Sequence, residues 1–179
     1  MDQGRAPHGD RVLETSRLLL RPQQVPDAEV FRQLWLERDP RVPPHRRITP
    51  DGRPTLEDIE SQILQDDGCP SPGLLAVELR NTGQVIGYCG LISNKYGQPD
   101  EPELAYEFLR AVWGRGYATE SARTVVDQAR AIGYQRLWAT VRDWNVASRR
   151  VLAKSGFVET GRVEPDPVHG DSLFTAKVL

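Results

Sequence analysis

The residues best suited to chemistry lie in one glycine-rich stretch, LRAVWGRGYATES, at residues 109–121. The pattern predicts the end of a strand, glycines at 114 and 116, and then the start of a helix. Such a turn directs unpaired N–H groups and the positive end of a helix dipole at one point, which suits a phosphate or pyrophosphate. A helix entrance that only needs flexible backbone angles is the alternative. The stretch is not a Walker loop, because no Gly-Lys-Ser/Thr follows, and not GxGxxG, because position 119 is Thr.

Two carboxylates precede this stretch. Glu103 and Glu107 lie in ELAYEFL, whose pattern predicts a strand, so side-chain alternation places both on one face and Tyr106 on the other. Either glutamate suits a general base, and either could equally be a solvated strand residue. Tyr106 is expected in the core rather than as an acid, and Trp138 is expected in the core of a later strand.

The remaining pattern predicts the elements that position these residues. Helices are expected over about 27–36, from Thr55, over about 117–132 and over 146–155, and strands over 16–21, 74–80, 84–92, 103–109, 136–142, from 157 onward and 172–178. Thr55 is the expected N-cap of its helix, whereas Asp58 is expected to be too short for a standard capping-box partner. Gly133 is expected to end the third helix. The order β-α-α-β-β-β-α-β-α-β-β implies an α/β (α+β) fold with helices packed on a mixed sheet.

Composition narrows the class of protein. A chain of 179 residues with 39% hydrophobic and 27% charged residues predicts one globular domain, expected over 13–179 after a disordered tail at 1–12. A net charge of −2 gives no field toward nucleic acid or an anionic membrane, so neither partner is expected. Two cysteines, Cys69 and Cys89, favour a reducing compartment and a cytoplasmic location. The three histidines show no metal-ligand spacing, so no metal is expected.

Two longer segments resemble a known family. ELAYEFLRAVWGRGYATESA (103–122) with DWNVASRRVLAKSGFVETGR (143–162) resembles the GNAT superfamily of N-acetyltransferases, in particular its ribosomal-protein-alanine acetyltransferase-like (RimJ/RimL-type) branch, and LETSRLLLRP and GQVIGYCGLI are similar to that branch too. The resemblance runs from about residue 14 to the end. The family's Gln/Arg-x-x-Gly-x-Gly/Ala signature falls on Trp113, Gly116 and Ala118, with Trp113 departing from it. The resemblance implies a single GNAT-like domain, with a mostly antiparallel central sheet, helices on both faces and a splay between the strands at about 103–109 and 136–142.

The resemblance also implies acetyl-CoA as cosubstrate and a set of residues that bind it. The strand before the loop would hold the pantetheine arm through Phe108, Leu109, Arg110 and Ala111. The loop would hold the pyrophosphate through the amides of Gly114, Arg115, Gly116, Tyr117, Ala118 and Thr119. Asn145 would hydrogen-bond the pantetheine and could also serve as an N-cap. Ser148 would face the sulfur, although without the family pattern it would be a solvated helix residue.

The implied reaction is direct transfer of an acetyl group from a thioester to a neutral amine. Glu103 or Glu107 would be the base, and a backbone N–H near Phe108 or Leu109 would meet the developing charge on oxygen. Many family members place an acidic tyrosine where this chain has Leu152, so Ser148 is the expected hydrogen-bond donor to the departing sulfur. The basic residues Arg149, Arg150 and Lys154 could meet the 3′-phosphate of CoA or form a solvated face.

Several functions remain open. An α-amino group near pKa 8 is about a tenth neutral at pH 7 and a lysine under about a thousandth, so a modest base suffices for a protein N-terminus, the preferred acceptor. The alternatives are a small-molecule amine (antibiotic, amino acid or polyamine), a non-catalytic acetyl-CoA sensor, and a nucleotide-phosphate binder unrelated to CoA. The loops at 39–54 and 163–171 are expected to flank the acceptor side, and the chain is expected to be a monomer or homodimer.

Overall fold

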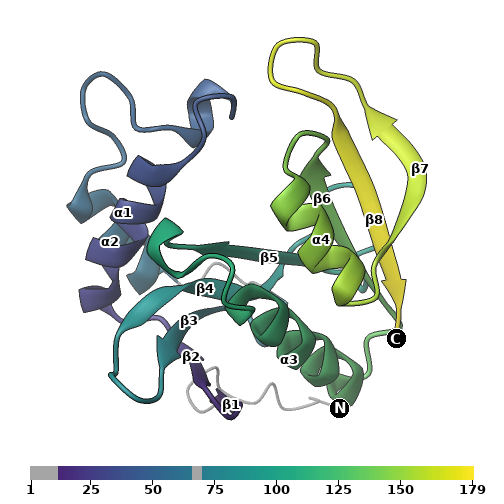
Figure 1. Cartoon of the computed structure of the whole chain (residues 1–179), viewed down its shortest axis with the longest axis horizontal. Helices are drawn as coiled ribbons and strands as arrows, with labels where there is room; N and C mark the ends of the chain where they lie inside the picture. Colours follow the sequence, from purple (N-terminus) through teal and green to yellow (C-terminus); the bar gives the residue numbers. More distant parts are fainter. Residues whose placement is uncertain (1–11, 66–69) are drawn as a thin grey trace, which may run out of the picture.

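The computed structural model describes residues 12–65 and 70–179. The expected tail up to residue 11 lies outside the described residues, as does Cys69. The described chain forms one eight-stranded sheet and four α-helices (Figure 1). The helices are α1 (Ala28–Glu37), α2 (Leu56–Leu64), α3 (Tyr117–Ile132) and α4 (Val146–Lys154). The strands are β1 (Leu13–Glu14), β2 (Leu18–Pro22), β3 (Leu74–Leu79), β4 (Val85–Ile92), β5 (Glu103–Phe108), β6 (Arg136–Arg142), β7 (Val158–Glu164) and β8 (Ser172–Val178).

The sheet has the order β1-β2-β3-β4-β5-β6-β8-β7 and is antiparallel except where β5 meets β6. These two strands are parallel, and the register pairs Glu103 with Trp138 and goes no further. The Trp138 amide donates to the Pro102 carbonyl at 3.0 Å. Beyond this point β5 and β6 diverge, which confirms the predicted splay and leaves the carboxyl-terminal part of β5 without a strand partner on that side.

Helices cover both faces of the sheet, as expected. Apolar side chains of the strands point to both faces, so each face needs a layer that buries them. Leu75 and Val77 of β3 join the larger core, which α3 closes with Ala122, Val125 and other buried residues. Ala76, between them, points to the other face and joins a smaller core beneath α1 and α2. Figure 1 shows α1 and α2 together at one side, α3 along β4 and β5, and α4 beside β6.

The helix ends follow local signals, with one difference from expectation. Thr55 caps α2, and Asp58 completes a full capping box, since the Thr55 amide donates to the Asp58 carboxylate at 2.8 Å and the Asp58 amide donates to the Thr55 hydroxyl at 3.1 Å. The expectation that Asp58 is too short was therefore wrong. Gly133 ends α3 in the left-handed conformation, as predicted. Among the described residues, no helix has the length and apolarity needed to cross a membrane.

Candidate active site

The glycine-rich loop has the geometry of an open helix start. Gly114 and Gly116 have φ angles of +76° and +83°, which residues with a Cβ rarely adopt. The first hydrogen bond of α3 runs from the Glu120 amide to the Gly116 carbonyl at 3.0 Å, so the amides of residues 117–119 have no partner inside the helix. In the described part of the chain, no side chain caps this helix. The loop therefore presents several N–H donors and the positive end of a 16-residue helix to an incoming anion.

Arg17, whose role sequence reasoning missed, braces this loop from the start of the chain. Its Nη1 donates to the Arg115 carbonyl at 3.0 Å, its Nε donates to the Glu120 carboxylate at 2.8 Å, and its guanidinium lies 4.6 Å from the Tyr117 ring centre. Burial by itself would raise the pKa of the Glu120 carboxyl, but hydrogen bonds from Thr15 and Arg17 outweigh it and hold that pKa below its ordinary value. Arg17 thus neutralises a carboxylate beside the loop and fixes the direction of one loop carbonyl. In the sequence, its segment LETSRLLLRP carries a family resemblance but no sign of this contact.

A cavity of about 520 Å³ begins at this loop and runs along α3. Gly116 and Thr119 line its start, and Arg17, Arg123 and Lys154 supply basic side chains. The expected basic cluster on α4 is divided by the fold. Arg149 is engaged with the Glu159 carboxylate at 2.7 Å, whereas Lys154 lines the cavity and Arg150 is exposed.

The backbone of β5 offers fewer free donors than expected. The Leu109 amide donates to the Ile86 carbonyl at 3.0 Å and the Arg110 amide donates to Glu37 Oε2 at 2.7 Å, so both have partners within the chain. Because backbone groups of an antiparallel ladder alternate, bonding at Leu109 directs the groups of Tyr106 and Phe108 to the other side, toward the splay. The Trp113 indole N–H already donates to the Phe108 carbonyl at 2.7 Å. This contact gives the unusual signature residue Trp113 a role in joining strand and loop, while the amides of Tyr106 and Phe108 remain directed at the splay.

The two predicted glutamates share a face of β5 but have different surroundings. Glu107 accepts two hydrogen bonds from Arg38, at 2.8 and 2.7 Å, and a third from the Tyr88 hydroxyl at 2.9 Å. Glu103 lies where β5 and β6 last pair, and its Oε1 accepts the Thr140 amide of β6 at 2.9 Å. Glu107 is therefore held in place and neutralised by an arginine. Glu103 lies at the base of the splay and is held by a backbone amide, with no cationic partner on its carboxylate among the described residues. Arg38 and Tyr88 had no signal in the sequence.

The fold brings the two predicted α4 residues to the opposite side of the splay. The Asn145 side-chain oxygen accepts a hydrogen bond from the Ser148 amide at 3.1 Å, so Asn145 caps α4, which is the N-cap role expected as its alternative. The Tyr106 hydroxyl lies 2.8 Å from Ser148 Oγ. Tyr106 packs against the larger core as expected, but its hydroxyl reaches out of it. Leu152 is 2% exposed and belongs to the core, so this position supplies packing and no acid.

The loops expected to flank the acceptor meet at one tryptophan. The Trp144 indole N–H donates to the His169 carbonyl at 2.7 Å, and the Arg41 guanidinium lies 4.1 Å from the Trp144 ring centre. Trp144 therefore connects the loop at 163–171 with the proline-rich loop at 39–54.

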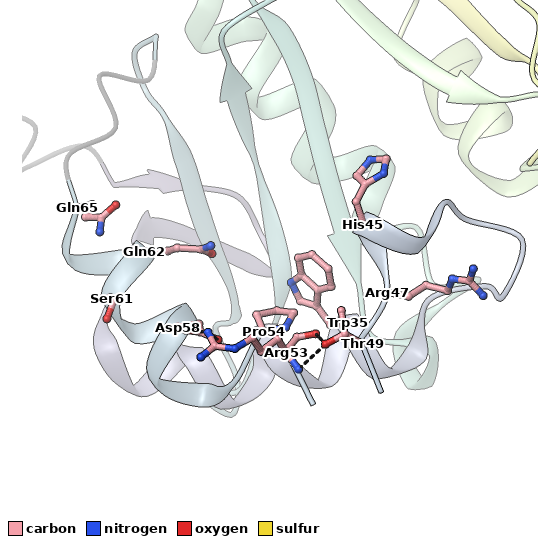
Figure 2. Close-up of a pocket in the computed structure, with 10 residues that line it drawn as sticks. All are labelled: Trp35, His45, Arg47, Thr49, Arg53, Pro54, Asp58, Ser61, Gln62 and Gln65. Atoms are coloured by element: carbon pink, nitrogen blue, oxygen red, sulfur yellow. Dashed lines mark hydrogen bonds and ion pairs between the residues drawn. The ribbon is translucent and has the colours of Figure 1, made fainter. Parts of the chain in front are cut away.

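A second cavity, of about 500 Å³, lies between that proline-rich loop and α2. Figure 2 shows His45 and Arg47 of the loop at one side of it and Trp35 in the middle. Ser61 and Gln62 of α2, with Gln65 directly after the helix, lie at the other side. Arg38, which binds Glu107, stacks at 3.8 Å on the Trp35 ring, so this cavity adjoins the Glu107 cluster.

The expectation for Trp138 needs correction. Its side chain is only partly buried, and its indole N–H donates to Glu101 at 2.7 Å. Leu137, Ala139 and Val141 occupy the buried face of β6, so alternation turns Trp138 away from that core.

Comparison with known proteins agrees with this geometry. Residues 17–158 match the family described as the acetyltransferase (GNAT) domain. An uncharacterized N-acetyltransferase p20 of Bacillus licheniformis is 29% identical over 157 residues, which is 83% of each protein. The uncharacterized protein YkkB of Bacillus subtilis is 32% identical over 148 residues, covering 80% of this chain and 83% of YkkB.

Solved structures show the same fold. A GNAT-family acetyltransferase from Bacillus anthracis has a TM-score of 0.74 at 22% identity, covering 94% of this chain and 98% of the other. The ribosomal-protein-S5-alanine acetyltransferase from Vibrio fischeri has a TM-score of 0.73 at 19% identity, covering 94% and 97%. RimJ from Mycobacterium smegmatis, solved in complex with CoA-disulfide, has a TM-score of 0.65 at 23% identity, covering 90% and 81%. The family match spans most of the sequence, and the chain therefore belongs to the GNAT family of acetyltransferases.

Proposed function

We propose that this acetyltransferase takes its acetyl group from acetyl-CoA and transfers it to the α-amino group of a protein N-terminus. The observation that carries the proposal is the uncapped start of α3 beside the splay of β5 and β6. A pyrophosphate is the anion that this arrangement of amides suits, and an extended thiol-bearing arm fits an unpaired strand edge. RimJ from Mycobacterium smegmatis, a structural neighbour, was solved with CoA-disulfide, and this supports the choice of ligand.

The residues present fit acetyl-CoA in three places. The amides of Gly114 to Thr119 would hold the pyrophosphate, and Arg123 and Lys154 would add positive charge along the adjoining cavity, where Glu120 neutralises Arg17. The backbone groups of Tyr106 and Phe108 would hold the pantetheine arm, replacing Leu109 and Arg110, whose amides have partners. The Asn145 amide nitrogen remains available for the same arm, because only its oxygen takes part in capping α4.

Acetyl-CoA supplies a thioester, whose C–S bond breaks as the amine nitrogen forms the new C–N bond. Glu103 would take the proton that the nitrogen loses, directly or through a water. The Phe108 or Tyr106 amide would stabilise negative charge on the acetyl oxygen. The C–S electron pair stays on sulfur, and Ser148 would donate a hydrogen bond to the thiolate, which then takes a proton from solvent. A thiol of pKa about 8.5 needs no stronger acid at neutral pH.

The surroundings of the two glutamates support an α-amine as acceptor. Arg38 neutralises Glu107 and Tyr88 donates a hydrogen bond to it, which leaves Glu103 as the one carboxylate of the pair that has no cationic partner in the described part of the chain. A modest base suffices for an α-amine, which is a few hundredfold more often neutral at pH 7 than a lysine side chain, taking pKa values of about 8 and about 10.4. The acetyltransferase from Vibrio fischeri has the same fold. Its name gives an alanine of ribosomal protein S5 as what is acetylated, and this supports a protein acceptor for the present chain.

A peptide panel tests the proposal. Thiol release and peptide mass are measured with acetyl-CoA and three acceptors: peptides with a free N-terminus, the same peptides N-terminally blocked but containing lysine, and a polyamine. We expect the free N-terminal peptides to be acetylated at the α-nitrogen at pH 7 and the blocked ones to react far more slowly. Turnover with the polyamine alone would indicate a small-molecule acetyltransferase. Acetyl-CoA binding without turnover on any amine would indicate a sensor, and neither result is compatible with the proposal.

A further inference from the structure

The Tyr106 phenol and the Ser148 hydroxyl form a hydrogen-bonded pair across the splay. Tyr106 Oη lies 2.8 Å from Ser148 Oγ and 3.1 Å from the Ser148 carbonyl oxygen. The two residues come from different elements, β5 and α4, which meet at the place where the sheet separates. The Tyr106 ring packs against the core that contains Leu104 and Phe108, and this packing holds its hydroxyl in position.

Two arrangements of protons satisfy these distances. In the first, the phenol donates to the Ser148 carbonyl and the serine hydroxyl donates to the phenol oxygen. The serine proton is then engaged inside the protein and cannot reach a ligand. In the second, the phenol donates to Ser148 Oγ, which frees the serine proton to point at a ligand. The second arrangement alone makes Ser148 a donor to the departing sulfur.

We propose that Tyr106 is a positioning residue that donates to Ser148 Oγ and turns the serine proton toward the thioester sulfur. The inference rests on the proposed function. A phenol is a stronger hydrogen-bond donor than an aliphatic alcohol, and a hydroxyl that accepts one hydrogen bond donates a second more strongly. Negative charge on sulfur therefore selects the arrangement in which both donors point the same way.

Two further features agree with this role. Burial raises the pKa of the Tyr106 phenol above its ordinary value, so the phenol keeps its proton as a donor at neutral and mildly alkaline pH. Leu152, one helical turn after Ser148, is buried and provides no hydroxyl of its own. A purely structural role is the competing interpretation, in which the hydrogen bond only fastens α4 to β5.

The two interpretations differ in whether Tyr106 acts through Ser148. We would measure kcat with acetyl-CoA and a free N-terminal peptide for the wild type, Tyr106→Phe, Ser148→Ala and the double variant. Calorimetry gives the Kd for CoA of each protein, and thermal unfolding shows whether each is folded. Tyr96→Phe is the matched control, since it removes a phenol hydroxyl that contacts Glu164 at 3.4 Å.

We expect Tyr106→Phe to lower kcat by up to about tenfold, the upper end of what one hydrogen bond between neutral groups contributes, while Kd for CoA changes less than about twofold. In the Ser148→Ala background the same substitution should change kcat by less than about twofold, because the hydroxyl it orients is gone. Tyr96→Phe should leave kcat unchanged.

Three results would overturn the role of Tyr106 alone, provided that the wild type turns over. These are an unchanged kcat in Tyr106→Phe, an equal loss in both backgrounds, and a rise in Kd that accounts for the lost activity. A wild type that binds CoA but acetylates no amine would refute the proposed function, and the role of Tyr106 with it.

Discussion

Replacing Gly116 by alanine tests the assignment of the phosphate loop. Gly116 has a φ of +83°, and a Cβ there would meet Arg17 Nη2 at 3.5 Å, an ordinary contact. The substitution therefore adds backbone strain without a clash. A residue with a Cβ in the left-handed region costs about 1–2 kcal/mol. The variant should therefore fold, with a Tm lowered by several degrees at most, since about 1 kcal/mol shifts the Tm of a domain this size by about 2–4 °C.

The same strain should weaken binding of acetyl-CoA. If the alanine relaxes toward a right-handed conformation in the free protein, the amides of the loop lose their common direction, and binding must restore the strained form. Whatever part of the roughly 1–2 kcal/mol of strain the free protein escapes in this way must be restored on binding, which raises Kd by up to about 5- to 30-fold, a change that calorimetry with CoA resolves readily.

Gly161 provides the matched control. It has a φ of +80° in β7, and a Cβ there would meet nothing within 4 Å, so Gly161→Ala carries the same strain away from the loop. We expect Gly161→Ala to lower Tm without changing Kd, and Gly116→Ala to raise Kd with a loss of Tm no larger than that of Gly161→Ala. Equal Kd values for the two variants would remove the loop from the cofactor site, and the assignment of the site would fail.

The remaining predictions concern three charged groups. The Glu120 carboxyl has a pKa below its ordinary value of 4.5, so the stability it contributes is present above that value and lost as pH falls. Arg17→Gln should therefore be less stable than the wild type in urea at pH 7, and the difference should shrink from pH 5 to pH 3; a constant difference would contradict the linkage. Glu103→Gln should lower kcat at least about 100-fold, the low end of what a general base contributes, whereas Glu107→Gln should lower it far less, and an unchanged kcat in Glu103→Gln would exclude Glu103 as base. Glu107→Gln should instead lower the free energy of unfolding by about 1–3 kcal/mol, measured in urea, because Arg38, whose side chain is 9% exposed, loses its counter-charge.

Local signals made much of the fold predictable. The glycines at 116 and 133 mark the ends of α3, Thr55 marks the start of α2, and each signal acts over only a few residues. Asp58 shows the limit of reasoning from side-chain length, because a short carboxylate reaches back to the cap when the first helical turn brings the two backbones together. The splay also followed from the sequence, but through family resemblance rather than through any local pattern.

The site was less predictable because its polar contacts join distant residues. Glu107 meets Arg38, 69 residues earlier, and Glu120 meets Arg17, 103 residues earlier. Alternation along β5 placed Glu103 and Glu107 on a common face, but it carries no information about what covers each one. The difference between a neutralised carboxylate and a candidate base is set by where α1 ends, and that depends on tertiary packing.

Tyr106 was correctly predicted to lie on the core face of β5, but that prediction says nothing about where its hydroxyl reaches. Its face of β5 is apolar, as predicted, and most of its ring is core. Ser148 and Leu152 are four residues apart and so lie on one face of α4, and the burial of Leu152 turns that face toward β5. A hydroxyl on the strand then meets the serine, at the turn of α4 nearest the splay. Many family members have a tyrosine on the helix as the donor to the sulfur; in the arrangement proposed for this chain, a serine on the helix and a tyrosine on the strand would take its place.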